Sequence, residues 1–126
     1  MSELFPTTKQ ATGWHLLADL YGIEADLLTQ APLIEQLLRE AAEAAGATIL
    51  LGHFHSFGPM QGVTGVLLLA ESHISIHTWP EFGFAAADIF MCGQAQPQTA
   101  MEVIRLALKP SSCDVNTTRR GVAQTS

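Results

Sequence analysis

Charged residues are scarce in this chain, and lysine and arginine are the scarcest of them. Only 14% of the 126 residues are charged, and 6 Lys and Arg stand against 12 Asp and Glu. The only run of basic residues is Arg119–Arg120, so the sequence lacks the positive surface that nucleic-acid binding requires. We therefore expect no nucleic-acid partner, and the net charge of −6 suits a cationic substrate.

Long hydrophobic runs are also absent. The longest uninterrupted apolar stretch is Val66–Ala70, which is far too short to span a bilayer. The first residues, MSELFPTTKQ, are polar and lack the apolar segment of a signal peptide. These absences predict a cytoplasmic protein with no membrane partner. In that compartment Cys92 and Cys113, the only cysteines, are expected to be free thiols.

Hydrophobic residues, by contrast, are abundant for a small chain. They make up 48% of a sequence whose length fits one domain. Part of the resulting apolar surface is expected to be covered by a partner. A second copy of the chain is the default partner, which predicts a homodimer.

The hydrophobic periodicity predicts an α+β fold. Two amphipathic helices are expected after Pro32 and Pro97, each with apolar residues at helical spacing. Tight turns between strands indicate a mainly antiparallel sheet in a two-layer sandwich, with both helices packed on one face. The domain is expected over 13–121, between a leader, 1–12, and a polar tail, 122–126. The predicted strands cover 15–21, 47–57, 63–70, 73–79, 84–91 and 114–118.

Reactive side chains concentrate between Thr64 and Cys92. Each has an ordinary structural explanation when it is taken alone. Ser72 follows a buried strand and can simply end it, and a lone cysteine such as Cys92 is more often a small buried hydrophobe than a nucleophile. His77 on a strand and Glu81 in a turn are equally unremarkable. Taken together, they call for a common explanation.

The run ESHISIHTWPE over 71–81, followed after a strand's length by Cys92–Gly93, resembles the self-processing segment of prokaryotic S-adenosylmethionine decarboxylases. The similarity extends over 13–121. Further segments look like the family's opening Gly–basic–His, its helix exit and its strand pair before the cleavage site: Gly13–His15, Gly46–Thr48, His55–Phe57 and Gln61–Val66.

The resemblance implies a covalent cofactor made from the chain itself. Ser72 would attack the carbonyl of Glu71, and cleavage between these residues would leave a pyruvoyl group at position 72. His77 would accept the proton during processing, because an imidazole exchanges protons near neutral pH. The pyruvoyl group would form a Schiff base with the substrate's amine. Cys92 would then donate the proton that replaces the lost carbon dioxide.

The resemblance also implies the substrate and its contacts. S-adenosylmethionine is the expected substrate, and its product supplies aminopropyl groups for spermidine synthesis. Phe57 looks like the aromatic that stacks on adenine, Glu81 looks like the carboxylate that binds the ribose hydroxyls, and Glu71 would lie near the sulfonium. Thr64 replaces a family serine that assists processing and catalysis. The family forms dimers with sites at or near the interface.

Alternative readings of the same residues stay open. Relatives carry the same pyruvoyl chemistry on arginine or ornithine, and the core motif does not choose between these substrates. A non-catalytic, dimerising relative would keep the fold without cleavage. A zinc protein is a further alternative, because one set of residues could supply three or four ligands: His53, His55, His73, His77 and Cys92. We expect no metal, because zinc leaves the rest of the 71–81 run unexplained. The sequence does not decide whether a diamine such as putrescine stimulates the protein.

Overall fold

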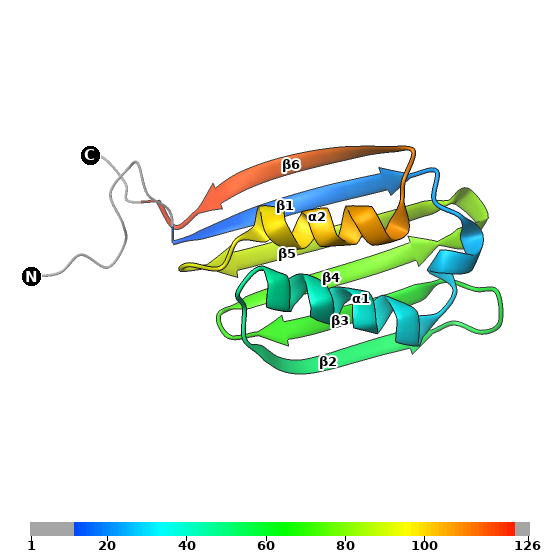
Figure 1. The fold of residues 1–126 in the computed structure, drawn as a ribbon, viewed down its shortest axis with the longest axis horizontal. Coiled ribbons are helices and arrows are strands. Elements are labelled where there is room, and N and C mark those ends of the chain that lie inside the picture. Colours follow the sequence, from blue (N-terminus) through cyan, green and yellow to red (C-terminus); the bar gives the residue numbers. More distant parts are fainter. Residues whose placement is uncertain (1–11, 123–126) are drawn as a thin grey trace, which may run out of the picture.

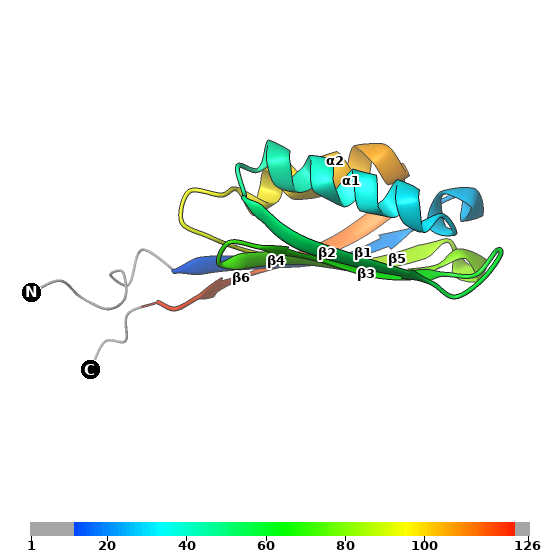
Figure 2. The same cartoon turned by 90° about the horizontal axis from the view of Figure 1, so that it is seen from below.

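A computed structural model describes residues 12–122 of the chain. It is a two-layer α+β sandwich, in which a six-stranded antiparallel sheet is covered on one face by two helices (Figures 1 and 2). The predicted fold class is thereby confirmed. The strand order is β2-β3-β4-β5-β1-β6. Of the predicted leader and tail, all but Thr12 and Val122 lies outside the described residues.

The elements follow the predicted order. The strands are β1 Gly13–Tyr21, β2 Ile49–Ser56, β3 Val63–Leu69, β4 Ser72–Trp79, β5 Phe84–Cys92 and β6 Ser112–Arg120, and the helices are α1 Ala31–Ala44 and α2 Pro97–Leu108. Two short 3-10 helices, η1 Ala25–Leu28 and η2 Pro80–Phe82, lie beside the end of the sheet. The turn in which Glu81 was expected is thus a 3-10 helix, and η1 has no counterpart in the predictions.

Proline and residues with positive φ mark the helix limits. Pro32 and Pro97 lie in the first turns of α1 and α2, where a missing N–H breaks no intrahelical bond. Gly46, with φ of 84°, follows the end of α1, and Lys109, with φ of 52°, follows the last residue of α2. No helix among residues 12–122 is long and apolar enough to cross a membrane.

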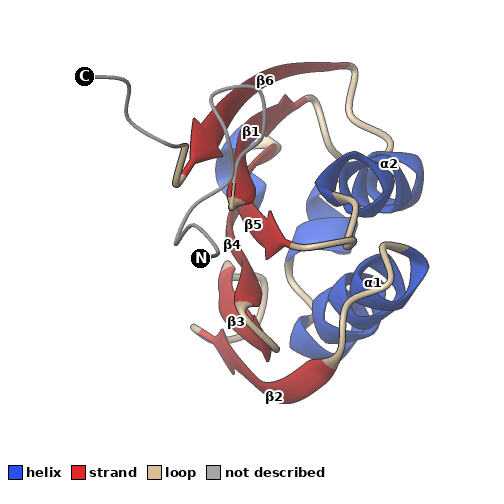
Figure 3. Cartoon of the chain, turned by 90° about the vertical axis from the view of Figure 1, so that its left-hand side faces the viewer, coloured by secondary structure: helices blue, strands red, loops and turns tan. Residues whose placement is uncertain are grey.

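Strict alternation along the central strands separates the two faces of the sheet. Ile74, Ile76 and Ile89 are fully buried beneath the helices, whereas His73, Ser75 and His77 belong to the other face, because side chains alternate along a strand. Figure 3 shows both helices on one side of the sheet, so no element within residues 12–122 covers the second face.

The uncovered face carries large apolar side chains. Leu17 is 46% exposed, Leu51 60% and Leu68 44%, and Tyr21 is 40% exposed. Leu51 and Leu68 are direct neighbours in the β2–β3 ladder. Exposed apolar side chains gathered on one flat sheet face are typical of a surface that another protein covers.

Candidate active site

The β3–β4 turn presents a strained residue at the predicted cleavage point. Ala70 and Glu71 form this turn, and Leu69 pairs with Ser72 across it. Glu71 has φ of 60°, in the left-handed region that glycine adopts freely and other residues rarely do. Such a conformation costs about 1–2 kcal/mol for a residue with a Cβ. The bond between Glu71 and Ser72 therefore follows a backbone torsion under strain.

Ser72 and Cys92 lie side by side at this end of the sheet. Ser72 is the first residue of β4 and Cys92 the last residue of β5. The backbone N–H of Cys92 donates a hydrogen bond to Oγ of Ser72, with an N···O distance of 3.2 Å. This donor would favour the alkoxide that forms when the Ser72 hydroxyl loses its proton before it attacks a carbonyl.

The environment of Cys92 favours its protonated form. Burial raises the pKa of the Cys92 thiol above its ordinary value, and the nearby negative charge of Glu71 raises this pKa further. A thiol with a raised pKa keeps its proton at neutral pH, so Cys92 is suited to donate a proton and poorly suited to act as a thiolate nucleophile.

Four other predicted residues surround a separate hollow of about 300 Å³ near the opposite end of β3 and β4. Thr64 Oγ1 and His77 Nδ1 are 3.1 Å apart, within hydrogen-bond distance. Phe57 and Glu81 line the same hollow, and the Phe57 ring is 62% exposed. The hollow thus offers an aromatic face, a carboxylate and a hydroxyl–imidazole pair.

Backbone close to this hollow is fixed by a small residue and a buried hydroxyl. A Cβ at Gly62 would lie within 2.1 Å of the Thr78 carbonyl oxygen, so only glycine fits there. The Thr78 hydroxyl donates to the Leu28 carbonyl at 2.7 Å and accepts from the Val63 N–H at 2.8 Å. Thr78 therefore ties η1 and β3 to β4.

The structure adds Gln61 and Trp79 to the lining of this hollow. Trp79 belongs to the motif of residues 71–81, and its position before a proline turn was the signal that could have included it. Its ring lies 6.2 Å from that of His77 and 5.3 Å from that of Phe84, measured between centroids. Gln61 begins the Gln61–Val66 segment of the family resemblance, but the resemblance gave it no role in the site.

The two groups of predicted residues do not meet within one chain. Ser72 and His77 lie on the same strand, and five residues of strand span about 16 Å at ~3.3 Å per residue. Their odd separation also assigns the two side chains to opposite faces of the sheet. Ser72, Glu71 and Cys92 therefore form one half of a candidate site, and the His77 hollow forms another.

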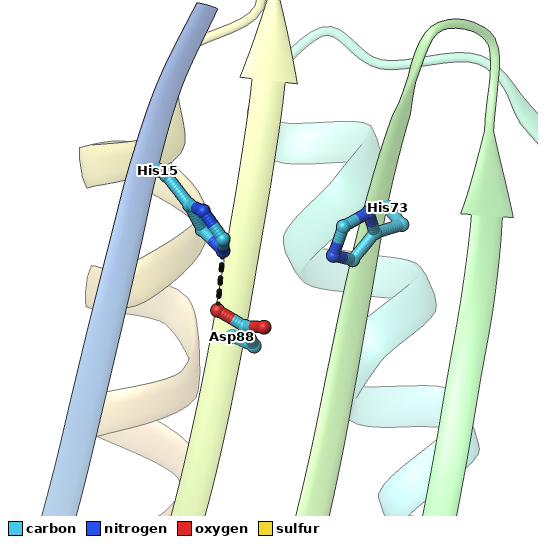
Figure 4. Close-up of side chains that lie close together, drawn as sticks. All are labelled: His15, His73 and Asp88. Atoms are coloured by element: carbon cyan, nitrogen blue, oxygen red, sulfur yellow. Dashed lines mark hydrogen bonds and ion pairs between the residues drawn. The ribbon is translucent and has the colours of Figure 1, made fainter. Parts of the chain in front are cut away.

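A third cluster lies on the uncovered face, beside Ser72. Among residues 12–122, only His15, His73 and Asp88 form a group of three whose His, Cys, Asp or Glu ligand atoms are close enough to hold a metal (Figure 4). The zinc alternative named five residues as possible ligands, and only His73 of these five belongs to this cluster. His15 Nε2 lies 2.6 Å from Oδ1 of Asp88, and Arg120 Nη1 lies 3.3 Å from His15 Nδ1.

The partners of His15 fix its tautomer and disfavour a metal. A guanidinium can only donate hydrogen bonds, so Nδ1 of His15 accepts one from Arg120. Nε2 of His15 therefore carries the ring proton and donates a hydrogen bond to Oδ1 of Asp88. Both ring nitrogens are then engaged, and the positively charged Arg120 lies next to the His15 ring. The cluster is therefore better described as a hydrogen-bonded and aromatic network than as a metal site.

Comparisons with known proteins agree on one family. The sequence model of the family described as S-adenosylmethionine decarboxylase matches residues 14–121. The S-adenosylmethionine decarboxylase proenzyme of Persephonella marina is 47% identical over 114 residues, covering 90% of this chain and 85% of its own length. The proenzyme of Methanococcus maripaludis is 46% identical over 113 residues, covering 89% and 92%.

A solved structure shows the same fold. The crystal structure of the adenosylmethionine decarboxylase from Aquifex aeolicus superposes with a TM-score of 0.83 at 41% sequence identity. The alignment covers 93% of this chain and 97% of the Aquifex chain. Sequence and structure therefore agree over nearly the whole length of both proteins.

Proposed function

The chain belongs to the S-adenosylmethionine decarboxylase family, and we propose that it cuts itself between Glu71 and Ser72 and then decarboxylates S-adenosylmethionine. One observation supports cleavage at this bond most directly. The left-handed Glu71 directly precedes a serine whose hydroxyl oxygen receives the N–H of Cys92. The product of the decarboxylation would supply aminopropyl groups for spermidine synthesis, in the cytoplasm.

The residues present fit a pyruvoyl group derived from Ser72. The strained turn would lower the barrier to attack on the Glu71 carbonyl, and the Cys92 N–H would favour loss of the proton from the attacking Ser72 hydroxyl. A pyruvoyl group supplies the electron-withdrawing carbonyl that makes loss of carbon dioxide from an amino acid feasible. Cys92, beside position 72 and with its thiol pKa raised, holds the proton that the product must receive.

The hollow around His77 supports binding of the adenosyl part of the substrate. Phe57 presents an exposed ring for stacking on adenine, and the Glu81 carboxylate on η2 can accept hydrogen bonds from two ribose hydroxyls. Arginine and ornithine have neither an aromatic ring nor a ribose, so they would leave both groups unused. The lining of the hollow therefore favours S-adenosylmethionine over these two amino acids.

A complete site requires two copies of the chain. Ser72 and Cys92 at one end of β4 cannot reach His77 and Thr64 of the same chain, about 16 Å away on the other face. A homodimer that buries the uncovered faces against each other would bring the His77 hollow of one copy to the end of the sheet where the Glu71–Ser72 turn and Cys92 of the other copy lie. Two-fold symmetry would then create two equivalent sites. The exposed Leu17, Leu51 and Leu68 support this interface.

The mass of the denatured chain tests the cleavage, and release of labelled carbon dioxide tests the reaction. We expect two fragments, one ending at Glu71 and one blocked at position 72, and turnover of S-adenosylmethionine but not of arginine or ornithine. Ser72→Ala should stay intact and inactive. An intact wild-type chain, or normal cleavage of Ser72→Ala, would refute the proposal.

A mixed dimer tests whether the site is shared. His77→Ala alone should remain uncleaved, since its dimer has no processing base. When it is co-expressed with Ser72→Ala, the His77→Ala chain should be cleaved, because the partner supplies an intact His77. His53→Ala, which removes an exposed histidine on β2, serves as the matched control and should cleave normally. Failure of the mixed dimer to cleave would show that His77 acts elsewhere.

A further inference from the structure

The cluster of His15, His73, Asp88 and Phe90 has no role in the proposed chemistry, yet it adjoins the reacting residue. His73 follows Ser72 directly in β4. Its ring lies 6.0 Å from that of Phe90 and 6.1 Å, edge-on, from that of His15, measured between centroids. In the sheet register Phe90 stands between His15 on β1 and His73 on β4. Figure 4 shows His15, His73 and Asp88 projecting from neighbouring strands on the face away from the helices.

The partners of His73 are themselves held in place. Nε2 of His15 donates to Asp88 over 2.6 Å, and Nδ1 of His15 accepts from Arg120 at 3.3 Å. The His15 side chain is only 19% exposed. The Arg120 guanidinium also lies 6.0 Å from the Phe90 ring centroid. Four strands therefore contribute to a single network, in which hydrogen bonds hold His15 and ring contacts join His73 to it.

Space for this network is built into the start of β1. A Cβ at Gly13 would lie 2.7 Å from Cζ of Phe90, so only glycine lets the Phe90 ring lie over β1. Phe90 is two residues from Cys92 on the same strand, with its side chain on the same face. The network thus connects the residue after Ser72 with the strand that carries Cys92.

Cleavage before Ser72 changes what holds this residue. In the uncut chain the turn at Ala70–Glu71 ties residue 72 to β3. Cutting the bond turns residue 72 into a chain end, and chain ends fray unless other contacts hold them. The first side chain that remains fixed beyond the cut is His73.

We propose that His15 and Asp88 are positioning residues, which clamp His73 through the network and so hold the cut end at position 72 beside Cys92. This inference rests on the proposed cleavage between Glu71 and Ser72. Before the cut the network of His15 and Asp88 matters little, because the Ala70–Glu71 turn already holds residue 72 in place. After the cut it sets the distance between the new chain end and the Cys92 thiol.

Hydrogen exchange of the first β4 amides tests the clamp without relying on activity. In the cleaved wild-type protein we expect these amides to be protected. His15→Ala should still be cleaved but should exchange about tenfold faster there, the equilibrium effect of losing one hydrogen bond to a charged group. In the uncut Ser72→Ala background the same His15→Ala change should leave exchange at these amides unaltered.

Two further variants separate the clamp from a general loss of structure. His15→Gln keeps both a donor for Asp88 and an acceptor for Arg120, and should restore most of the protection. His53→Ala, on the same sheet face but outside the network, should match wild type. Edman degradation after turnover adds a chemical readout, because a proton delivered to the cofactor carbon in place of the substrate carbon, followed by hydrolysis, leaves a free alanine at position 72 and releases an aldehyde. His15→Ala should accumulate more of this alanine than wild type per product formed.

The outcomes separate the two proposals. A wild-type chain that stays intact overturns the proposed function and the clamp with it. A cleaved wild-type chain whose His15→Ala variant keeps full protection and does not accumulate alanine overturns the clamp alone. Equal loss of protection in the cut and uncut backgrounds also overturns it, since His15 would then only stabilise the sheet.

Discussion

The strained turn before Ser72 should accelerate self-cleavage, and the effect can be measured with two small substitutions at one position. Glu71 has φ of 60°, which costs a residue with a Cβ about 1–2 kcal/mol and glycine almost nothing. If cleavage releases all of this strain in its transition state, Glu71→Gly should be cut about 5- to 30-fold more slowly than Glu71→Ala. The comparison of Gly with Ala isolates the Cβ, because both variants lack the carboxylate.

The assay follows the fraction of intact chain with time after purification under denaturing conditions and refolding. The same pair in a Ser72→Ala background, which cannot cleave, measures the strain independently. In that background the free energy of unfolding in denaturant should be about 1 kcal/mol higher for Glu71→Gly than for Glu71→Ala. The reasoning would be refuted if Glu71→Gly stabilises the uncut Ser72→Ala chain and yet is cleaved as fast as Glu71→Ala when Ser72 is present. The strain would then persist in the transition state.

Three further results are expected. Glu71→Gln should move the alkylation of Cys92, followed by mass spectrometry, to lower pH, because the carboxylate that helps to raise the thiol pKa is gone. The transition should still lie above that of a free cysteine, since burial remains, and an unchanged profile would remove Glu71 from the environment of Cys92. Thr78→Val should lower the free energy of unfolding by about 1–3 kcal/mol, because two backbone partners of its buried hydroxyl lose their bonds. Thermal unfolding of the uncleaved chain checks this, and an unchanged midpoint would contradict it. Glu81→Gln should lower kcat/KM for S-adenosylmethionine about ten- to hundredfold while leaving cleavage intact, and equal kinetics would disconnect Glu81 from the substrate.

The main elements of the fold could be predicted because their apolar residues follow a clear period. The helices after Pro32 and Pro97 and the central strands appear where the pattern placed them. The last strand, β6, is longer than the predicted 114–118, because nearly all of its side chains are exposed and show no alternation. The short η1 was not predicted, since its four residues are too few to show a period.

Part of the site geometry was also present in the sequence. Counting outward from the two turns gives the register of both hairpins that share β4, and this register places Thr64 opposite His77 and brings Cys92 beside Ser72. The neighbours of His15 could not be obtained in this way. They depend on β1 entering the sheet between β5 and β6, a long-range pairing that no local pattern specifies.

The register also explains why sequence could not reveal how the two half-sites combine. β4 carries Ser72 at its start and His77 close to its end, so the hairpins that it forms with β5 and β3 deliver their reactive pairs to opposite ends of the sheet. A stiff strand cannot fold back to join them. Two copies placed face to face and related by a two-fold axis can join opposite ends at no cost to either fold. The proposed homodimer would therefore explain both the apolar uncovered face and the divided site, because the same interface would cover that face and join the two half-sites.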